Sequence, residues 1–405
     1  MKNIWRKIKG AFIDLATIWG DEMKMTVKDE GVLIFFIVVP LLYPLLYSWI
    51  YNNEVVREVP VAVVDLSHSS QSREFLRMCD ASPDVKVAYY CNNLEEAREL
   101  VGRQMVRGVL YFPHEFATSL NRGEQTSVSV YCDMSLMLTY KAIYQTALGV
   151  STKINTRIQI ENSTGFTDRD DDITTRPLDI EEVEIFNPTG GYGNAVLPAV
   201  LIIIIQQTLL LGIGLAAGTS RENNRYHNLV PISRHHNGVL RIVCGKALCY
   251  LMIYAILSAY LTLIVPKIFG FTSLVTAKSM IGLMLPFLLS CIFFGMTISC
   301  LIRYRENVLL IVVFTSLILL FMTGISWPQS NIPGFWQGVA WLFPSTFGVR
   351  GFLKISSMGG DLMDMATEYK ALWAQVIVYF LLACAVYKVQ INRVYKNTYK
   401  EKEEE

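Results

Sequence analysis

Six long apolar blocks constrain what this chain can fold into. Each is long enough to cross roughly 30 Å of hydrocarbon as a helix, and they cover residues 31–51, 195–217, 244–266, 279–302, 307–326 and 371–388. Of the 405 residues, only 18% are charged, whereas a soluble domain has about 25% charged residues. The sequence therefore predicts an α-helical polytopic membrane protein with six transmembrane helices.

Lysine and arginine are unevenly distributed over the segments that flank these blocks. They are frequent before the first block, between the second and third, between the fourth and fifth, and after the sixth. The short loops on the other side carry only Lys267 and Lys278 in one case and Arg350, Lys354 and Lys370 in the other. Positive charge is retained on the cytoplasmic side. We therefore expect both termini in the cytoplasm and residues 52–190 on the other side of the membrane.

Residues 1–30 have the pattern of an amphipathic helix. Apolar residues recur at helical spacing, with Lys2, Arg6 and Lys9 on the other side, although Ile13 breaks the pattern; the apolar residues are Ile4, Ile8, Ala11, Phe12, Leu15 and Trp19. Such a helix lies on a membrane surface, here the cytoplasmic one; the alternative is a helix packed on protein. Residues 389–405 are expected to form a cytoplasmic tail.

Residues 52–190 form the one large hydrophilic block. Four segments are rich in β-branched and aromatic residues, namely 59–66, 84–90, 107–113 and 127–134. Helical stretches lie between them, and one begins with Asn93 as a candidate N-cap. Alternating strands and helices indicate an inserted extracytoplasmic α/β domain. A helical run over 136–162 and an acidic linker over 167–184 follow.

Cysteine and histidine do not indicate a metal site or a defined disulfide. Cys79, Cys91 and Cys132 fall in the hydrophilic block, so at most one disulfide is expected there, and the sequence does not decide its partners. His235 and His236 lie in a basic loop and are expected to be solvated. We expect no catalytic, cofactor-binding or metal-ligating residue.

The central parts of the six blocks contain no ionisable residue. Ion-coupled transport and catalysis within the membrane both need such groups, so both are disfavoured. Four uncharged polar residues are candidates for the lining of a translocation pathway: Gln206, Gln207, Thr315 and Ser316. The alternative for them is hydrogen bonding between helices. Gly214 and Gly218 form a GxxxG pattern that suits close helix packing.

Gly245 and Lys246 are reminiscent of a phosphate-binding loop, but the pattern fails. A Walker A motif needs a further glycine five positions earlier and Ser or Thr after the lysine, and Ala247 stands there instead. The chain is therefore expected to bind no nucleotide, and any uphill transport needs a partner that hydrolyses ATP.

Four local patterns occur in a fixed order along the chain. A strand ending in Asp65 is followed by a serine-rich turn. A strand–helix segment then carries Val109, Leu110, Pro113, Phe116, Leu120 and Gly123. The segment after the second block carries Arg221, Glu222, Pro231, Ile232, Ser233, Arg234, Gly245 and Lys246. The segment between the last two blocks carries Gly324, Trp327, Pro328, Pro333, Pro344, Ser345, Thr346 and Arg350.

With these patterns, nearly the whole chain resembles the permease subunit of a bacterial ABC-2 type exporter with a large extracytoplasmic domain between its first two spans. One departure is the run from Asn223 to His227, where the family usually has Gly-Thr. The resemblance implies partners: a second permease copy or close homologue, and an ABC ATPase subunit, two copies per dimer, in a lipid bilayer. It leaves open a periplasmic adaptor and an outer-membrane channel. No nucleic acid partner is expected.

The resemblance also implies roles for two segments within the five-helix part, residues 191–388. A cytoplasmic coupling segment, 219–240, would contact the ATPase through Arg221, Glu222, Leu229, Pro231 and Arg234. An outer re-entrant segment, 328–352, would gate the pathway through Trp327, Pro328, Pro333, Pro344 and Arg350. Each proline there is expected to end a helix.

The resemblance thus implies an exporter in the bacterial inner membrane, with residues 52–190 extracytoplasmic. The uncharged spans favour a hydrophobic or amphipathic substrate, moved out of the cytoplasm or the inner leaflet. The alternative is a non-transporting membrane receptor or scaffold that acts through its extracytoplasmic domain.

Overall fold

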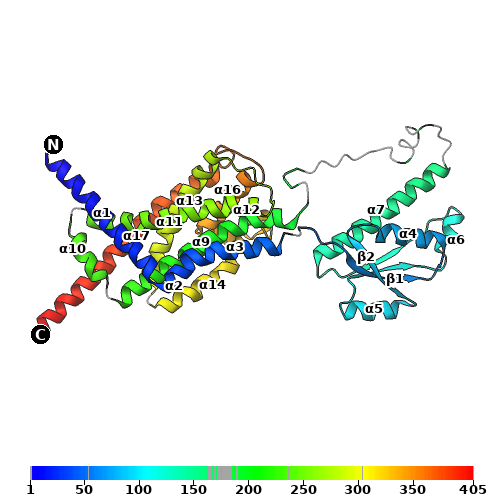
Figure 1. Ribbon diagram of the computed structural model, residues 1–405, viewed down its shortest axis with the longest axis horizontal. Coiled ribbons are helices and arrows are strands. Elements are labelled where there is room, and N and C mark those ends of the chain that lie inside the picture. Colours follow the sequence, from blue (N-terminus) through cyan, green and yellow to red (C-terminus); the bar gives the residue numbers. More distant parts are fainter. Residues whose placement is uncertain are drawn as a thin grey trace. The chain divides into compact units, whose positions relative to one another are not determined.

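The computed structural model describes residues 2–52, 54–162, 167, 170, 175, 185–187, 190–223, 225–235, 237–302 and 304–404. The chain divides into two compact units (Figure 1). The α/β unit is Val55–Glu184, and the membrane unit is Met1–Glu54 together with Ile185–Glu405. Of the expected linker 167–184, only residues 167, 170 and 175 belong to the described part.

The α/β unit contains a four-stranded sheet in the order β2-β1-β3-β4. Its strands are β1 (Val59–Asp65), β2 (Val85–Cys91), β3 (Gly108–Phe112) and β4 (Ser129–Cys132). β1 is parallel to both of its neighbours, and β4 is antiparallel to β3. Each of the four expected strand segments therefore forms a strand of one sheet.

Helices cover both faces of this sheet (Figure 1). They are α4 (Ser70–Asp80), α6 (Phe116–Asn121) and α7 (Met137–Asn162) on one face and α5 (Leu94–Gly102) on the other. Val61 and Val63 of β1 point towards α4 and α7, whereas Ala62 and Val64 point towards α5, because successive strand residues alternate between faces. Asn93 caps α5 as expected: its side-chain oxygen accepts the Glu96 backbone N–H at 2.8 Å.

The three cysteines of this unit are free. Burial, with the nearby charge of Asp80, raises the pKa of Cys79 to about 12, and burial raises that of Cys132 to about 11. Both therefore remain thiols near neutral pH and behave as small apolar side chains.

The membrane unit confirms the prediction of six membrane-spanning helices. Among the described residues, six helical spans are long and apolar enough to cross a bilayer: Glu30–Ile50, Tyr192–Glu222, Gly238–Ile268, Ala277–Cys300, Arg305–Met322 and Ala366–Tyr395. In order they are formed by α2 (Glu30–Leu33), η1 (Ile34–Val38) and α3 (Val39–Ile50); α9 (Tyr192–Glu222); α11 (Gly238–Ala259), η3 (Tyr260–Ile264) and α12 (Val265–Ile268); α13 (Ala277–Leu301); α14 (Arg305–Met322); and α17 (Ala366–Glu404). A long helix, α1 (Lys2–Lys28), precedes them.

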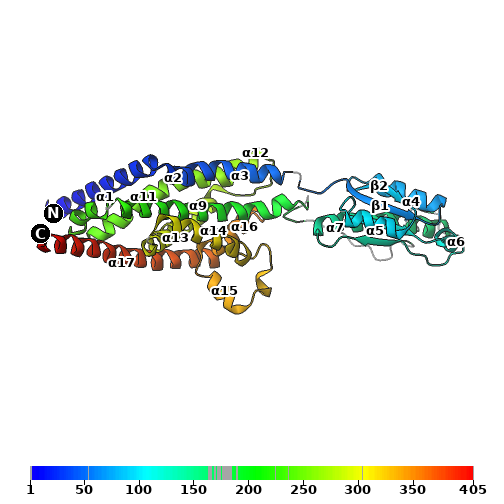
Figure 2. The same cartoon turned by 90° about the horizontal axis from the view of Figure 1, so that it is seen from below.

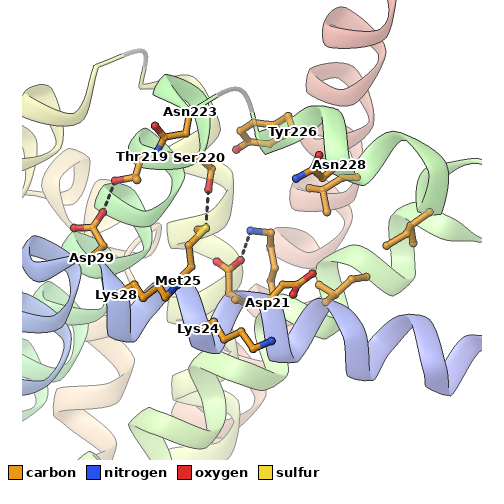
Figure 3. Close-up of a pocket in the computed structure, with 15 residues that line it drawn as sticks. Asp21, Lys24, Met25, Lys28, Asp29, Thr219, Ser220, Asn223, Tyr226 and Asn228 are labelled. Carbon is orange, nitrogen blue, oxygen red and sulfur yellow. Dashed lines mark hydrogen bonds and ion pairs between the residues drawn. The ribbon is translucent and has the colours of Figure 1, made fainter.

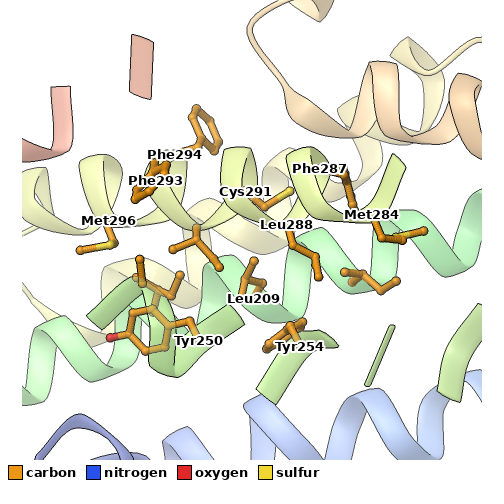
Figure 4. Close-up of a cluster of buried hydrophobic side chains, with 14 of the residues drawn as sticks. Leu209, Tyr250, Tyr254, Met284, Phe287, Leu288, Cys291, Phe293, Phe294 and Met296 are labelled. Atoms are coloured by element: carbon orange, nitrogen blue, oxygen red, sulfur yellow. The ribbon is translucent and has the colours of Figure 1, made fainter. Parts of the chain in front are cut away.

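The core of this unit forms around α9, the most enclosed of the spans. Figure 4 shows Leu209 facing Tyr254 and Leu288, which lie on the neighbouring helices α11 and α13. Glycines allow close contacts: a Cβ at Gly214 would lie 2.4 Å from Val308 of α14, so the GxxxG pattern serves the α9–α14 contact. The first and fifth spans expose most of their surface, which leaves it to lipid or to another protein.

The stretch between α14 and α17 contradicts one expectation. It forms η4 (Gln329–Asn331), α15 (Gly334–Ala340) and α16 (Pro344–Ser356). Here the prolines begin these elements rather than end them: Pro328 and Pro333 are N-cap residues, and Pro344 is the first residue of α16. The physical reason is that the first backbone N–H groups of a helix have no partner within the helix. Proline, which lacks this N–H, therefore loses no hydrogen bond there.

Candidate functional site

A cavity of about 510 Å³ lies at the end of the membrane unit that holds α1, and Figure 3 shows it. We call it the α1 groove. α1 forms one wall, and the C-terminal end of α9, η2 (Arg225–Leu229), α10 (Val230–Ser233) and the start of α11 form the others. Its lining is Ile18, Asp21, Glu22, Lys24, Met25, Lys28, Asp29, Thr219, Ser220, Asn223, Tyr226, Asn228, Leu229, Ile232 and Lys246.

Three carboxylates attach α1 to the rest of the unit. Asp14, Glu22 and Asp29 are spaced 8 and 7 residues apart, which places them on one side of a helix. Asp14 and Glu22 each bind a cation of α11, and Asp29 binds one of α14. The C-terminal half of α1 is therefore held, where it lies beside α11 (Figure 2).

Glu22 forms the most buried of these contacts. The Lys246 ammonium donates to its carboxylate at 2.6 Å, and the Tyr250 hydroxyl donates to the other oxygen. The two charged side chains are only 5% and 8% exposed, so each needs the other to compensate for lost hydration. Gly245 allows this approach, because a Cβ there would lie 2.9 Å from Ile18. The Gly245-Lys246 pair thus joins α1 to α11.

Asp14 lies eight residues before Glu22, nearer the N-terminal end of α1. It accepts from the Arg241 guanidinium at 2.6 Å and contacts His235 Nδ1 at 3.0 Å. Burial alone would raise the pKa of Asp14, but the hydrogen bonds and charges of His235 and Arg241 outweigh it and lower the pKa below its ordinary value.

Asp29 ends the row of carboxylates at the junction of α1 and α2. It accepts from Arg305 of α14 at 2.8 Å and from the Thr219 hydroxyl of α9 at 2.6 Å, and it caps α2. Burial opposes ionisation here too. The bonds from Thr219, the Val32 backbone and Arg305 nevertheless lower the pKa of Asp29.

The expected coupling residues do not all occupy similar places. Glu222, Pro231 and Arg234 are exposed, and Leu229 is half-buried in the lining of the α1 groove. Arg234 also lies over the Tyr395 ring of α17, 4.8 Å from its centroid.

Arg221 differs from the other four. Its guanidinium donates to the backbone carbonyls of Cys300 and Ile302, and to that of Ser299 at 3.3 Å. These carbonyls lie at the C-terminal end of α13, where helix carbonyls lack partners within the helix. Arg221 therefore fastens α9 to the end of α13, and its donors face inward.

The four pathway candidates are not brought together. Gln206 is fully buried, and its side-chain oxygen accepts the backbone N–H of Ser345 at the start of α16, at 2.6 Å. Gln207 is 8% exposed, and within the described part of the chain neither polar atom of its side chain has a hydrogen-bond partner. Thr315 and Ser316 lie on the exposed α14 and donate to carbonyls of their own helix.

The expected gate residues also fall into two groups. Trp327, Pro328 and Pro333 are exposed, whereas Pro344 is buried at the start of α16. Arg350 is half-buried on α16, near Glu368, whose carboxylate is bound by Lys354 at 2.8 Å. That this segment re-enters the membrane remains a prediction.

The carboxylates of α1 were not among the predicted site residues, and none of their cationic partners was predicted to bind them. A signal was present, since Asp14, Glu22 and Asp29 share a side of α1 with the apolar Ile18 and Met25. Across the residues described, no group of three potential ligands could hold a metal ion. The α1 groove presents charged side chains next to apolar ones.

Comparison with known proteins gives two findings. A family model described as "ABC-2 family transporter protein" matches residues 31–385. The linearmycin resistance permease protein LnrN of Bacillus subtilis (strain 168) is 22% identical over 378 residues, which cover 87% of this chain and 93% of that protein. The family match favours a permease over a receptor or scaffold. α1 lies outside the matched residues.

Proposed function

Since the chain belongs to the ABC-2 transporter family as a permease subunit, we propose that two copies of it, or one copy and a close homologue, dock two copies of a separate ABC ATPase and export a hydrophobic or amphipathic compound. Members of this family are the transmembrane subunits, so the family itself implies an ATPase partner and the pairing of permeases. Neither the fold nor the comparisons supports a periplasmic adaptor or an outer-membrane channel, and the proposal includes neither.

The α1 groove carries this proposal. It lies at the end of the spans flanked by most of the lysines and arginines, which supports a cytoplasmic location for it and for both termini. The α/β unit would then be extracytoplasmic. Leu229 and Ile232 offer apolar contact surface, while Asp21, Lys24 and Lys28 offer charged contacts around it. A partner bound there touches α1 and the α9–α11 connection together.

The ion pairs of α1 supply a route for motion. A displacement of α1 acts on α11 through Glu22 and Lys246, and on α9 and α14 through Asp29. We propose that closure of the ATPase moves these spans together, and that α16 and the segment before it form the outward gate. Pathway roles for Gln206 and Gln207 belong to this proposal; Thr315 and Ser316 would join them only if a second copy faces α14.

Two observations support the substrate class. The central parts of the spans are uncharged, which favours a cargo with little charge. The name of the Bacillus subtilis relative assigns that protein to linearmycin resistance, and we propose that this chain likewise removes a toxic compound.

Topology is tested by cysteine labelling with a membrane-impermeant maleimide on intact cells. Three of the eight native cysteines are only half-buried, so Gln125→Cys and Asn228→Cys are made singly in a cysteine-free background. Both positions are exposed. We expect labelling at position 125 alone until the membrane is permeabilised. Labelling at position 228 but not 125 would reverse the orientation and refute export.

Docking is tested by the double variant Glu222→Arg and Leu229→Asp. The chain is purified with its ATPase and reconstituted, and ATP hydrolysis is measured with and without substrate. We expect the variant to lose most of the stimulation of hydrolysis while inserting normally. A matched control is Glu95→Arg with Leu94→Asp, the same exchanges at exposed positions of the α/β unit. Wild-type stimulation in the first variant would place the coupling surface elsewhere.

A further inference from the structure

The α/β unit contains a cavity of its own, separate from everything assigned above. Its volume is about 670 Å³, and we call it the α7 pocket. Small-molecule sites occupy roughly 300–1,000 Å³. One side of α7 forms a wall, the segment 123–130 forms the opposite one, and Phe116 and Leu120 of α6 together with Phe75 of α4 close the base.

The chemistry of the lining changes from the base to the rim. Phe75, Phe116 and Ala147 are almost fully buried at the base. Ala147, Ile154 and Ile158 recur at helical spacing along α7, so they present one apolar strip to the cavity. Polar side chains surround this strip: Gln125, Thr126, Ser127, Ser151, Asn155 and Gln159. Glu124 is the one charged residue of this lining within the described part of the chain.

Direct bonds between the helices hold the walls in place. Arg157 of α7 binds Glu74 of α4 through two parallel hydrogen bonds, of 2.7 and 3.0 Å. Gln71 of α4 donates to Asn121 at the end of α6 at 3.1 Å. Such a two-bonded arginine–carboxylate pair fixes orientation as well as distance. The cavity is therefore framed by connected elements.

We propose that the α7 pocket binds an uncharged amphipathic small molecule, with its hydrocarbon part on the apolar base and a hydroxyl or amide group at the rim. The hydrocarbon gains about 25 cal/mol for each Å² removed from water, and the rim offers hydrogen bonds to a neutral group. An anion would meet Glu124 and, among the described residues of the lining, no cationic side chain. This proposal is independent of the ATPase docking proposed above.

The test uses the full-length chain in lipid nanodiscs and dodecan-1-ol that carries a photoactivatable diazirine. After illumination, mass spectrometry maps the labelled peptides. We expect labels within 116–130 and within 144–159, in addition to labels on the spans from probe dissolved in lipid. Unlabelled dodecan-1-ol should compete for the pocket labels. Dodecanoate should compete about tenfold less well, because its carboxylate would lie at the rim near Glu124 without a cationic partner among the described residues of the lining.

Variants separate the pocket from the rest of the surface. Ser151→Phe places a ring into the cavity and should reduce the pocket labels about tenfold, since the ring occupies space that the ligand needs. Thr152→Phe, one residue along on an exposed side of α7, is the matched control and should label as wild type. Ala147→Leu fills the base with a smaller change and keeps the test decisive if Ser151→Phe folds poorly.

Three results would overturn the proposal. One is equal pocket labelling of wild type and of a folded Ser151→Phe or Ala147→Leu. Another is labelling confined to the spans, which is also expected if another part of this chain fills the pocket. The third is equal competition by dodecanoate, which would contradict the uncharged class of ligand.

Discussion

The two ends of the membrane unit are held together by different chemistry. At the end that contains α1, the helices are joined by ion pairs, in which Asp14, Glu22 and Asp29 each bind a cation of another segment. At the end that contains α16, most of the tertiary bonds are neutral. Gln206 accepts from Ser345, and Gln375 of α17 donates to the Trp341 carbonyl at 2.7 Å; the pair of Lys354 and Glu368 is the exception.

This difference indicates how each end can change. A buried ion pair is costly to break singly but can be displaced as a unit, because each charge keeps its partner. Neutral hydrogen bonds do not require their two groups to move together. At the α16 end the packing is close instead, since a Cβ at Gly348 or Gly351 would lie within 2.7 Å of α13 side chains. α16 can therefore move only if its packing changes. Rigid transmission therefore suits the α1 end, and repacking suits the α16 end.

The largest effect is expected when one partner of the buried pair of Glu22 and Lys246 is removed. Lys246→Ala or Glu22→Ala leaves a lone charge in the core, which costs about 3 to 5 kcal/mol in the free energy of unfolding. The loss of stability is measured by heating the protein in detergent and following, by size-exclusion chromatography, how much monodisperse protein remains. The double variant Glu22→Leu with Lys246→Met should lose less than either single variant. Additive losses would show that the two charges do not compensate each other.

An intermediate effect is expected at the neighbouring glutamines. Gln206→Leu leaves the Ser345 N–H at the start of α16 without its acceptor, which costs about 1 to 3 kcal/mol in stability. Gln207→Leu is the matched control on the same helix. It removes an amide whose polar atoms have no partner in the described part of the chain, so it should be neutral or stabilising. Equal losses in the two variants would mean that the bond to Ser345 contributes nothing.

The smallest effect is a pH dependence that, within the membrane unit, arises at the α1 end. The pKa values of Asp14 and Asp29 are lowered from 3.8, so their contribution is complete above about pH 4 and is lost as pH falls through the folded-state values. We expect each to contribute up to about 1 kcal/mol, because both lie near solvent. Asp29→Asn should flatten the acid limb of a plot of melting temperature against pH. An unchanged acid limb would exclude Asp29 as a contributor.

Local patterns in the sequence were enough to predict the spans and the strands. Hydropathy identified every span because a spanning helix must be apolar over its own length. The first strand was found because Val61 and Val63 face one core and Ala62 and Val64 the other, so its centre is apolar and rich in β-branched residues. Both signals are contained within a few neighbouring residues.

What the sequence did not reveal depends on residues far apart in the chain. Gln206 and Gln207 are identical in type and adjacent, yet Ser345, 139 positions away, decides which of them is bonded. Arg221 was expected to face a partner, and it caps a helix end about 80 residues further on. The prediction for the prolines of α15 and α16 was wrong because proline can either end a helix or begin one. The sequence does not show which, and the backbone shows that these prolines begin helices.

The order of synthesis gives the pair of Glu22 and Lys246 a further consequence. Glu22 leaves the ribosome 224 residues before Lys246, which at about 5 to 20 residues per second is a delay of roughly 10 to 45 s. During that time Glu22 has no cationic partner and remains hydrated. The same holds for Asp14 and Asp29, because Arg241 and Arg305 are also made later. The three carboxylates therefore keep their side of α1 in contact with water while the first spans insert. The helix reaches its final place only when the third span is present, so its docking marks a membrane unit that is already half assembled.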